Sequence, residues 1–374
     1  MFMRKTAPAL FLLAASLYFT AFTSSAEAVG PQRMYGDPIN YRTGMRPRYT
    51  ATADLTKGGR PDLIVVNSGS NSVSVLINNG DGTFRHAVDY AAGEMPWSVT
   101  VGDFDGDGNV DIATANKKGG SITVILGNGD GTFRGKLDYA AGSKPVSVIA
   151  VDFDMDGRVD LATANSGDNT VSVLLGSGDG AFNIKTDYDV GKQPFSLTAA
   201  DFNADRNIDL AVADTGDNTV TTISGNGDGT FRHGMSFPTG TGPVSIAVGD
   251  LDGDGQPDLV TADSTADKVS ALRGFPTGQF QSIDSYTTGI KPASVIITDL
   301  NKDGNPDMAV ANSGDNSVSV LLGMGLGLFQ SPDPYYVMTS PSSVISADFN
   351  GDGIPDLAVT NSQANNVSIL LGGQ

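Results

Sequence analysis

The residues best suited to chemistry lie in one short segment, Asp103–Asp111, which reads DFDGDGNVD and places carboxylates at positions 1, 3, 5 and 9. Closely spaced oxygen ligands around a sharply turning glycine, with no sulfur or imidazole nearby, are typical of protein sites for Ca²⁺. Asp and Gly are also common in plain turns, so the segment alone is ambiguous. Its repetition along the chain favours the calcium-binding interpretation.

The acidic loop recurs with a constant period of 49 residues. Its first aspartate returns at Asp152, Asp201, Asp250, Asp299 and Asp348, with a weaker copy at Asp54. A proline precedes each of the seven loops by seven residues: Pro47, Pro96, Pro145, Pro194, Pro243, Pro292 and Pro341. Self-similarity at a fixed period near 50 residues indicates a propeller or a solenoid.

One repeat contains four short segments with strand-like patterns and no helical periodicity. We expect strands over 98–103, 111–116, 122–127 and 133 to about 139, with a hairpin turn at Asn128-Gly129-Asp130-Gly131. Four antiparallel strands per repeat form a propeller blade. The sequence therefore predicts an all-β fold, a seven-bladed β-propeller.

The two ends of the chain predict how the ring closes. The last repeat stops at Gln374, before it reaches a fourth strand. Residues 35 to about 43 match that missing strand, since Tyr35 precedes Phe84 by 49 residues and Tyr41 precedes Tyr90 by 49. We expect this N-terminal strand to complete the last blade, because an open solenoid would leave its edge unpaired.

The first 28 residues have the pattern of a secretory signal peptide. Arg4 and Lys5 precede an apolar run, and Ala26-Glu27-Ala28 provides a small-residue cleavage site. An uncleaved anchor is the alternative. We expect residues 29–374 to form a single, monomeric propeller domain without a membrane span, located outside the cell or in a periplasm.

Composition narrows the classes of partner. The chain has no cysteine, which excludes disulfides and thiolate metal sites. Its net charge is -19, or -20 once the segment with Arg4, Lys5 and Glu27 is removed. Such an acidic chain disfavours nucleic acid and anionic lipid as partners.

The repeats resemble a known family. Units such as GSKPVSVIAVDFDMDGRVDLATANSGDNTVSVLLGSGDGAF (residues 142–182) are similar to FG-GAP/VCBS repeats, the propeller type also found in integrin alpha subunits. The resemblance covers essentially the whole chain after the signal segment. It implies a seven-bladed propeller with calcium in the loops between the first and second strands, and it implies no single biochemical activity.

Comparison of the internal copies assigns the candidate ligands. Position 3 alternates between Asp and Asn, which keeps a side-chain oxygen, whereas position 7 varies so widely that only its backbone carbonyl could be a shared ligand. The candidate metal-ligating residues are Asp103, Asp105, Asp107, Asn109, Asp111, Asp152, Asp154, Asp156, Arg158, Asp160, Asp201, Asn203, Asp205, Asn207, Asp209, Asp250, Asp252, Asp254, Gln256, Asp258, Asp299, Asn301, Asp303, Asn305, Asp307, Asp348, Asn350, Asp352, Ile354 and Asp356.

Two loops depart from this pattern. In the fourth, Arg206 replaces the glycine at position 6 and brings a cation beside the site, which makes its occupancy doubtful. In the first, Thr56 and Gly58 replace two ligands, and we expect this loop to be empty. We expect about six bound Ca²⁺ ions, which would change the net charge from -20 to about -8.

The opposite face should carry the turns between the second and third strands, and there the copies differ. Candidate ligand-binding residues are Arg46, Arg48, Trp97, Lys117, Lys118, Lys144 and Phe195. Such a patch would suit an acidic polysaccharide or another extracellular anion, with the tryptophan ring stacking on sugar. The alternative, which we favour, is that Trp97 and Phe195 pack between blades, as Val146 and Val244 would at the same repeat position.

No nucleophile elbow, phosphate loop or histidine metal motif occurs, and we assign no catalytic residues. His86 and His233 lie three repeats apart, so they occupy the same position in two blades. The leading hypothesis is a noncatalytic binding or adhesion module for an extracellular glycan or protein. The alternatives are a lyase-like enzyme acting on polysaccharide and a structural surface protein without a discrete ligand.

Overall fold

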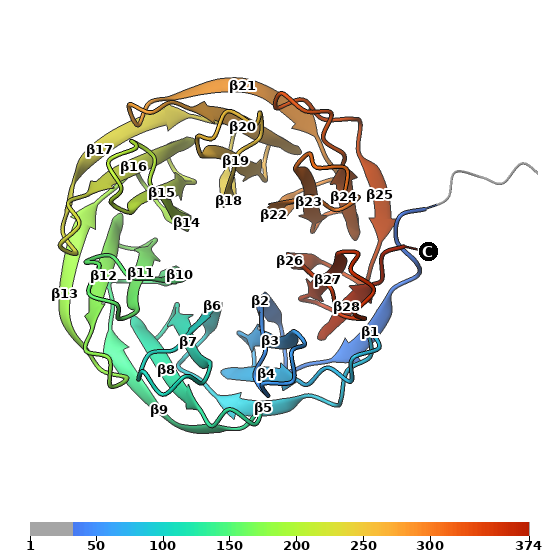
Figure 1. Cartoon of the computed structure of the whole chain (residues 1–374), viewed down its shortest axis with the longest axis horizontal. Coiled ribbons are helices and arrows are strands. Elements are labelled where there is room, and N and C mark those ends of the chain that lie inside the picture. The colour runs from blue at the N-terminus through green and yellow to red at the C-terminus, as the bar shows by residue number, and fades with distance from the viewer. Residues whose placement is uncertain (1–32, 374) are drawn as a thin grey trace, which may run out of the picture. The chain divides into compact units, whose positions relative to one another are not determined.

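A computed structural model describes residues 33–373, which form a ring of seven antiparallel sheets and contain no helix (Figure 1). The predicted signal segment, residues 1–28, lies outside the described residues. Each sheet is one blade with four strands, and the first strand of each blade lies innermost in the ring. The predicted all-β, seven-bladed propeller is confirmed.

The strands follow one another from the centre of the ring to its rim. Blades 1 to 4 comprise β2 (Pro47–Ala53), β3 (Asp62–Asn67), β4 (Ser72–Leu76) and β5 (Val88–Ala91); β6 (Pro96–Gly102), β7 (Asp111–Asn116), β8 (Ser121–Gly127) and β9 (Phe133–Ala140); β10 (Pro145–Val151), β11 (Asp160–Asn165), β12 (Thr170–Gly176) and β13 (Phe182–Asp189); and β14 (Pro194–Ala200), β15 (Asp209–Asp214), β16 (Thr219–Gly225) and β17 (Phe231–Pro238). Blades 5 to 7 comprise β18 (Pro243–Gly249), β19 (Asp258–Asp263), β20 (Lys268–Gly274) and β21 (Phe280–Thr287); β22 (Pro292–Thr298), β23 (Asp307–Asn312), β24 (Ser317–Leu321) and β25 (Asp333–Tyr336); and β26 (Pro341–Ala347), β27 (Asp356–Asn361) and β28 (Asn366–Leu370), completed by β1 (Ile39–Arg42).

The ring closes as the repeat arithmetic predicts. Strand β1 pairs antiparallel with β28, with Tyr41 opposite Val367, and Tyr35 forms a further bridge with Gly372. The Tyr35 side chain is 1% exposed and its ring meets that of Tyr335 edge-on at 5.3 Å. The N-terminal strand therefore completes the last blade.

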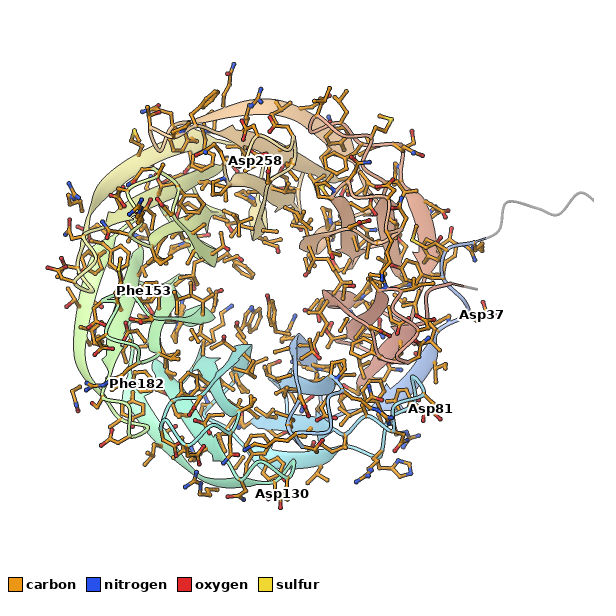
Figure 2. All side chains as sticks on the ribbon, in the orientation of Figure 1. Asp37, Asp81, Asp130, Phe153, Phe182 and Asp258 are labelled. Carbon is orange, nitrogen blue, oxygen red and sulfur yellow. The ribbon has the colours of Figure 1, made fainter. Side chains whose placement is uncertain are left out.

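Seven hydrophobic clusters hold neighbouring blades together. The second strand of every blade is buried at all six positions, so both of its faces pack against neighbouring blades. The aromatic residue at position 2 of an acidic loop reaches the next blade: Phe104 contacts Phe182 edge-on at 5.7 Å. Phe153 and Phe182 lie among the side chains that fill the space between blades (Figure 2).

Every first strand begins two residues earlier than expected and contains an irregularity. In blade 2, Pro96 pairs with Asn116 and Ser98 with Ala115, so Trp97 is an extra residue with no partner of its own. The same shift follows the first-strand proline in all seven blades. A bulge of this kind redirects a side chain out of the regular alternation.

A buried polar row crosses each blade where the second strand ends. In blade 3, the Asn165 amide donates to the hydroxyls of Thr170 (3.1 Å) and Ser172 (2.8 Å), and Ser172 donates to Asp187 at 2.6 Å. Blade 4 reverses these chemical types, because Asp214 replaces the asparagine and Ser236 replaces the outer aspartate. The carboxylate has thus moved from the rim to the interior.

We expect Asp214→Asn to stabilise the protein at pH 8. Burial raises the pKa of Asp214 to about 7, with the nearby Asp217 charge adding to the effect. Neither carboxylate oxygen accepts a well-formed hydrogen bond, since the Thr221 hydroxyl is aligned with Ser236 at 3.0 Å. The asparagine would find hydroxyl partners at Thr219 and Thr221, as Asn165 does in blade 3, and the gain should be about 1–3 kcal/mol.

The sign of the pH dependence follows from the raised pKa. Ionisation of Asp214 opposes folding above pH 7, and this cost fades as pH falls toward the ordinary carboxyl pKa of about 4. Urea unfolding at pH 8 and pH 5 should show the advantage of the variant shrinking at the lower pH. Asp263→Asn is the control, because Asp263 already accepts from Thr261 and Ser270 and should gain less. An advantage that is equal at both pH values would contradict the prediction.

Candidate functional site

The acidic loops share one hydrogen-bonded frame. In blade 2, Asp103 at position 1 accepts from the backbone N–H groups of Asp107 (3.2 Å) and Gly108 (2.9 Å). The buried Asp111 at position 9 accepts from Phe104 N (2.8 Å) and Gly127 N (2.7 Å), which ties the loop to strand β8. The first residue therefore folds the loop and the last one anchors it.

The anchoring role of position 9 does not depend on a metal. In loop 1, which lacks the carboxylates at positions 3 and 5, Asp62 still accepts from Leu55 N (2.9 Å) and Asn78 N (2.8 Å). This aspartate is therefore needed in all seven blades for the shape of the loop.

The six predicted loops offer a donor set that fits a hard cation. In three of them, three carboxylate oxygens lie within 4.8 Å of one another: Asp103, Asp105 and Asp111; Asp152, Asp154 and Asp160; and Asp250, Asp252 and Asp254. Burial, together with the charges of Asp105 and Asp107, raises the pKa of Asp111 to about 6. A divalent cation would relieve this repulsion, and oxygen-only ligands suit Ca²⁺.

Two arginines that the sequence did not single out reach these loops. Arg134 of β9 places its guanidinium 3.1 Å from Asp105 and 3.0 Å from Asp107. Arg273 of β20 contacts Asp252 and lies 3.3 Å from Asp254. Comparison of the repeats could have identified Arg273, because its position holds Ile, Leu or Ser in the other six repeats. Loops 2 and 5 therefore carry an internal cation that a bound metal would have to displace.

Loop 4 tests the role of glycine at position 6. Arg206 occupies that position with φ of 72°, a left-handed conformation that favours glycine. We expect Arg206→Gly to raise the free energy of unfolding by about 1 kcal/mol in chelator. In calcium the gain should be larger, because the variant also removes a cation beside the loop.

Met155→Gly is the matched control for this loop prediction. Met155 has φ of 60° at position 4 of loop 3 and carries no charge, so its gain should be the same with and without calcium. Denaturant unfolding in both buffers measures the four values. Equal gains for the Arg206 variant in calcium and chelator would show that its charge does not matter.

The seven bulge residues surround the central opening of the ring, which is called the channel below. Arg48, Trp97, Val146, Phe195, Val244, Ala293 and Ser342 occupy the same repeat position and line one pocket. The rings of Trp97 and Phe195, from blades 2 and 4, meet there edge-on at 6.3 Å. Packing of these two rings between neighbouring blades, which the sequence analysis favoured, is wrong, because the bulge turns both side chains into the channel.

Two cationic side chains lie over the ring of Trp97. The Arg48 guanidinium carbon lies 4.3 Å from its centroid and the Lys117 ammonium 3.8 Å from it. This cation–π arrangement orients both charges. The ring is thus engaged by the protein's own side chains, and the predicted stacking of Trp97 on sugar would require displacing them.

These cations have no acidic partner in the described chain. No ion pair there includes Arg46, Arg48, Lys117 or Lys144. Burial lowers the pKa of Lys117, and the charges of Arg48 and Lys144 lower it further. Lys118 differs, because its ammonium lies 3.3 Å from Glu94. Positive charge therefore gathers uncompensated at one end of the channel of an acidic protein.

Four pockets on this face join through shared residues. Pockets of about 450 Å³ and 190 Å³ share Arg48, and the latter shares Phe195 with a pocket of about 360 Å³. A pocket of about 430 Å³ joins that one through Lys117 and Lys144. The structure thus brings all seven predicted ligand-binding residues into one continuous surface around the channel mouth, where Lys118 lines the pocket of about 430 Å³.

A ring of four-stranded blades with acidic loops at one end of each defines a repeat propeller, and comparison with known families agrees. The FG-GAP-like repeat model matches residues 54–114, 103–163, 154–212, 201–261, 250–310 and 299–359. The chain belongs to the FG-GAP-like repeat family. No curated protein sequence matches it.

Solved structures share the fold at low sequence identity. BBS1N in complex with ARL6DN is 14% identical, with a TM-score of 0.66 over 91% of this chain and 98% of that one. Virginiamycin B lyase from Staphylococcus aureus is 15% identical, with a TM-score of 0.58 over 89% and 98%. A lectin of Agrocybe aegerita is 16% identical, with a TM-score of 0.52 over 88% and 97%. Among the described residues, no helix has the length and apolar character needed to span a membrane.

Proposed function

We propose that the chain is an exported, calcium-binding propeller that acts as a noncatalytic binding module for an extracellular glycan or protein. Export rests on the signal pattern of residues 1–28. Calcium binding rests on the oxygen-only donor set of the loops and on the repulsion among their carboxylates. The loops are structural in this proposal, because they recur in blade after blade.

The observation that carries the binding function is the channel mouth. Four cations without acidic partners and two aromatic rings gather there, at positions where most other repeats carry uncharged residues, with Lys291 of blade 6 as the exception. Maintaining unpaired, partly buried charges costs stability unless a ligand compensates them. The lectin among the structural relatives recognises terminal N-acetylglucosamine and BBS1N is bound to ARL6DN, so a propeller can present either kind of site.

Glycan and protein arrays probed in calcium buffer test the proposal. Trp97→Val and Arg48→Ser introduce the residues that Val146 and Ser342 place at the same bulge, so both variants should fold. We expect the wild-type protein to bind and both variants to lose binding, with unchanged circular dichroism. Turnover of an acidic polysaccharide by the wild-type protein would support the enzyme alternative instead, and binding that both variants retain would exclude this face.

A further inference from the structure

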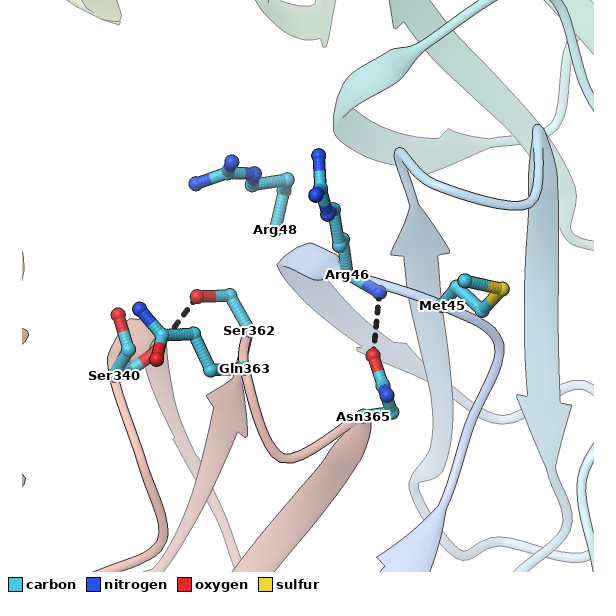
Figure 3. Close-up of a pocket in the computed structure, with 7 residues that line it drawn as sticks. All are labelled: Met45, Arg46, Arg48, Ser340, Ser362, Gln363 and Asn365. Atoms are coloured by element: carbon cyan, nitrogen blue, oxygen red, sulfur yellow. Dashed lines mark hydrogen bonds between the residues drawn. The ribbon is translucent and has the colours of Figure 1, made fainter.

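A hydrogen bond to a side-chain oxygen links most pairs of neighbouring blades. The residue just before each first-strand proline, here called the junction residue, donates its backbone N–H to a residue in the turn between the second and third strands of the preceding blade. Figure 3 shows the bond from Arg46 N to Asn365 Oδ1, 2.8 Å long, between blades 7 and 1. Equivalent bonds of 2.8–2.9 Å join Met95 to Asn71, Gln193 to Asn169, Gly242 to Asn218, Lys291 to Asp267 and Ser340 to Asn316.

The junction between blades 2 and 3 lacks this bond. Gly120 stands where the other turns have Asn or Asp, and no group in the described chain accepts the N–H of the junction residue Lys144. The backbone is unchanged, since Gly120 has φ of 61° and Asn169 has the same value. Only the side chain is missing, and a pocket of about 430 Å³ lined by Gly120, Lys117 and Lys144 occupies this side of the junction.

A second hydrogen bond is lost at the same turn. In blade 3, the Ser166 hydroxyl donates to the carbonyl of its junction residue, Lys144, at 2.9 Å. In blade 2 that serine is replaced by Lys117, whose ammonium instead lies against Trp97. The lost serine bond would reach the Met95 carbonyl within blade 2, so this turn exchanges one bond across the junction and one within its own blade for a free N–H donor and an uncompensated cation beside one pocket.

The missing group is an oxygen acceptor, and blade 5 shows that a carboxylate fits. There Asp267 accepts the N–H of the junction residue Lys291 at 2.8 Å. We propose that the gap at Gly120 is a carboxylate-binding site, in which a ligand carboxylate accepts the Lys144 N–H and pairs with the ammonium groups of Lys117 and Lys144. Hydrogen bonds between charged groups of this kind are stronger than neutral ones.

The surroundings assign the carboxylate to an acidic sugar. The adjoining pocket of about 360 Å³ adds the Phe195 ring, the Gln193 amide and the hydroxyls of Ser166 and Thr215. An aromatic face beside amide and hydroxyl groups matches the apolar and hydroxyl-bearing surfaces of a pyranose. The ligand is therefore a uronate-bearing glycan, an assignment that rests on the proposed binding function.

Calorimetry with short oligosaccharides in calcium buffer tests the ligand class. The probes are oligomers of galacturonate, of alginate and of hyaluronan, each paired with its carboxyl-reduced form, together with a sulfated neutral oligosaccharide and oligoglutamate. We expect at least one uronate oligomer to bind and its carboxyl-reduced form to bind at least about tenfold more weakly. Binding of only the sulfated probe or only oligoglutamate, or of no probe, would overturn the assignment.

Gly120→Asn tests the site itself and should act in opposite directions on two measurements. It fills the gap with the side chain that five other turns use, so binding of the uronate oligomer should fall at least about tenfold while the melting temperature rises. Lys117→Ser, which restores the serine found in blade 3, should also weaken binding. Lys291→Gln is the control, since Lys291 stands at the position of Lys144 in blade 6 and lines none of the four pockets, and blade 4 carries Gln193 there, so this variant should bind as the wild type does.

The outcomes separate this inference from the proposed function. Binding that is retained by Gly120→Asn but lost in Trp97→Val would overturn the carboxylate site and leave the channel-mouth module standing. Array binding that is lost in none of these variants would overturn both.

Discussion

Removing calcium should lower the melting temperature of the protein by on the order of 10 °C. Extracellular calcium sites typically bind in the range of about 10⁻⁴ to 10⁻³ M, so at about 10 mM calcium each loop would add about 1.4–2.7 kcal/mol to the folded state. Several loops act together, and Asp103, Asp152 and Asp250 each head a cluster of three carboxylates. Scanning calorimetry in calcium and in excess chelator measures the shift, and an unchanged transition in chelator would contradict calcium binding.

The pH dependence without calcium provides an internal check on this result. The position 9 residues Asp111, Asp160 and Asp258 have pKa values raised to about 6, first by burial and then by neighbouring aspartates. A raised carboxyl pKa means that ionisation opposes folding, so in chelator the protein should gain stability as pH falls from 7.5 to 5. Calcium should reverse the trend, because protons then compete with the metal. Magnesium, which requires a tighter octahedral site, is the control and should stabilise less.

Deleting strand β1, which closes the ring, should also lower the melting temperature by on the order of 10 °C and cause aggregation. A chain that begins at Thr43 loses strand β1, the buried Tyr35 and the edge-on contact of Tyr41 with Phe84 at 5.5 Å. Burial of one large aromatic side chain alone contributes about 3–5 kcal/mol. Strand β28 becomes an open edge, and such edges pair with other chains. Calorimetry and light scattering measure the two effects.

Two controls separate the effect of losing strand β1 from nonspecific effects of truncation. A chain that begins at Val29 keeps β1 and should melt as the full chain does. A synthetic peptide of residues 33–43, added to the truncated protein, should restore part of the lost stability by pairing with β28. If the truncated chain melted at the same temperature as the control chain, β1 would be dispensable and ring closure would rest on the hydrophobic cluster between blades 7 and 1.

The fold could be predicted closely because the repeats are in register. A constant period fixes the number of blades without any knowledge of packing, and the match of Tyr35 and Tyr41 to later repeats identifies the closing strand. In blade 2, the second strand begins and ends as expected, at Asp111 and Asn116, because the anchoring aspartate and the turn residues define its ends.

The placement of the candidate ligand residues was harder to predict. The segment from Pro96 to Ser98 has no glycine to mark a bulge, and the irregularity becomes visible only when strand pairing is known. Without it, the side chain of Trp97 takes the opposite side of the strand. The pairing of Lys118 with Glu94 likewise depends on the path of a turn, which repeat comparison cannot give.

The turns between the second and third strands make hydrogen bonds that the sequence alone could not predict. Asn165 and Asn169 look like ordinary turn residues, yet Asn165 bonds the buried hydroxyls and Asn169 bonds the junction residue Gln193. The departure at Gly120 has a meaning only once the bond that it lacks is seen in the other blades. Asn and Gly are both favoured in left-handed turn positions, so propensity does not distinguish a junction contact from a plain turn.

The hydrogen bond that is missing at Gly120 is a cross-link between blades at the other junctions. Six junctions are cross-linked by a side-chain oxygen in this turn, and the seam between blades 2 and 3 is the one that lacks this cross-link. A carboxylate held between Lys117 on one blade and Lys144 on the next would supply the absent cross-link. Ligand capture would then couple blades 2 and 3 mechanically, and pulling on a tethered ligand would load the ring at the seam between them.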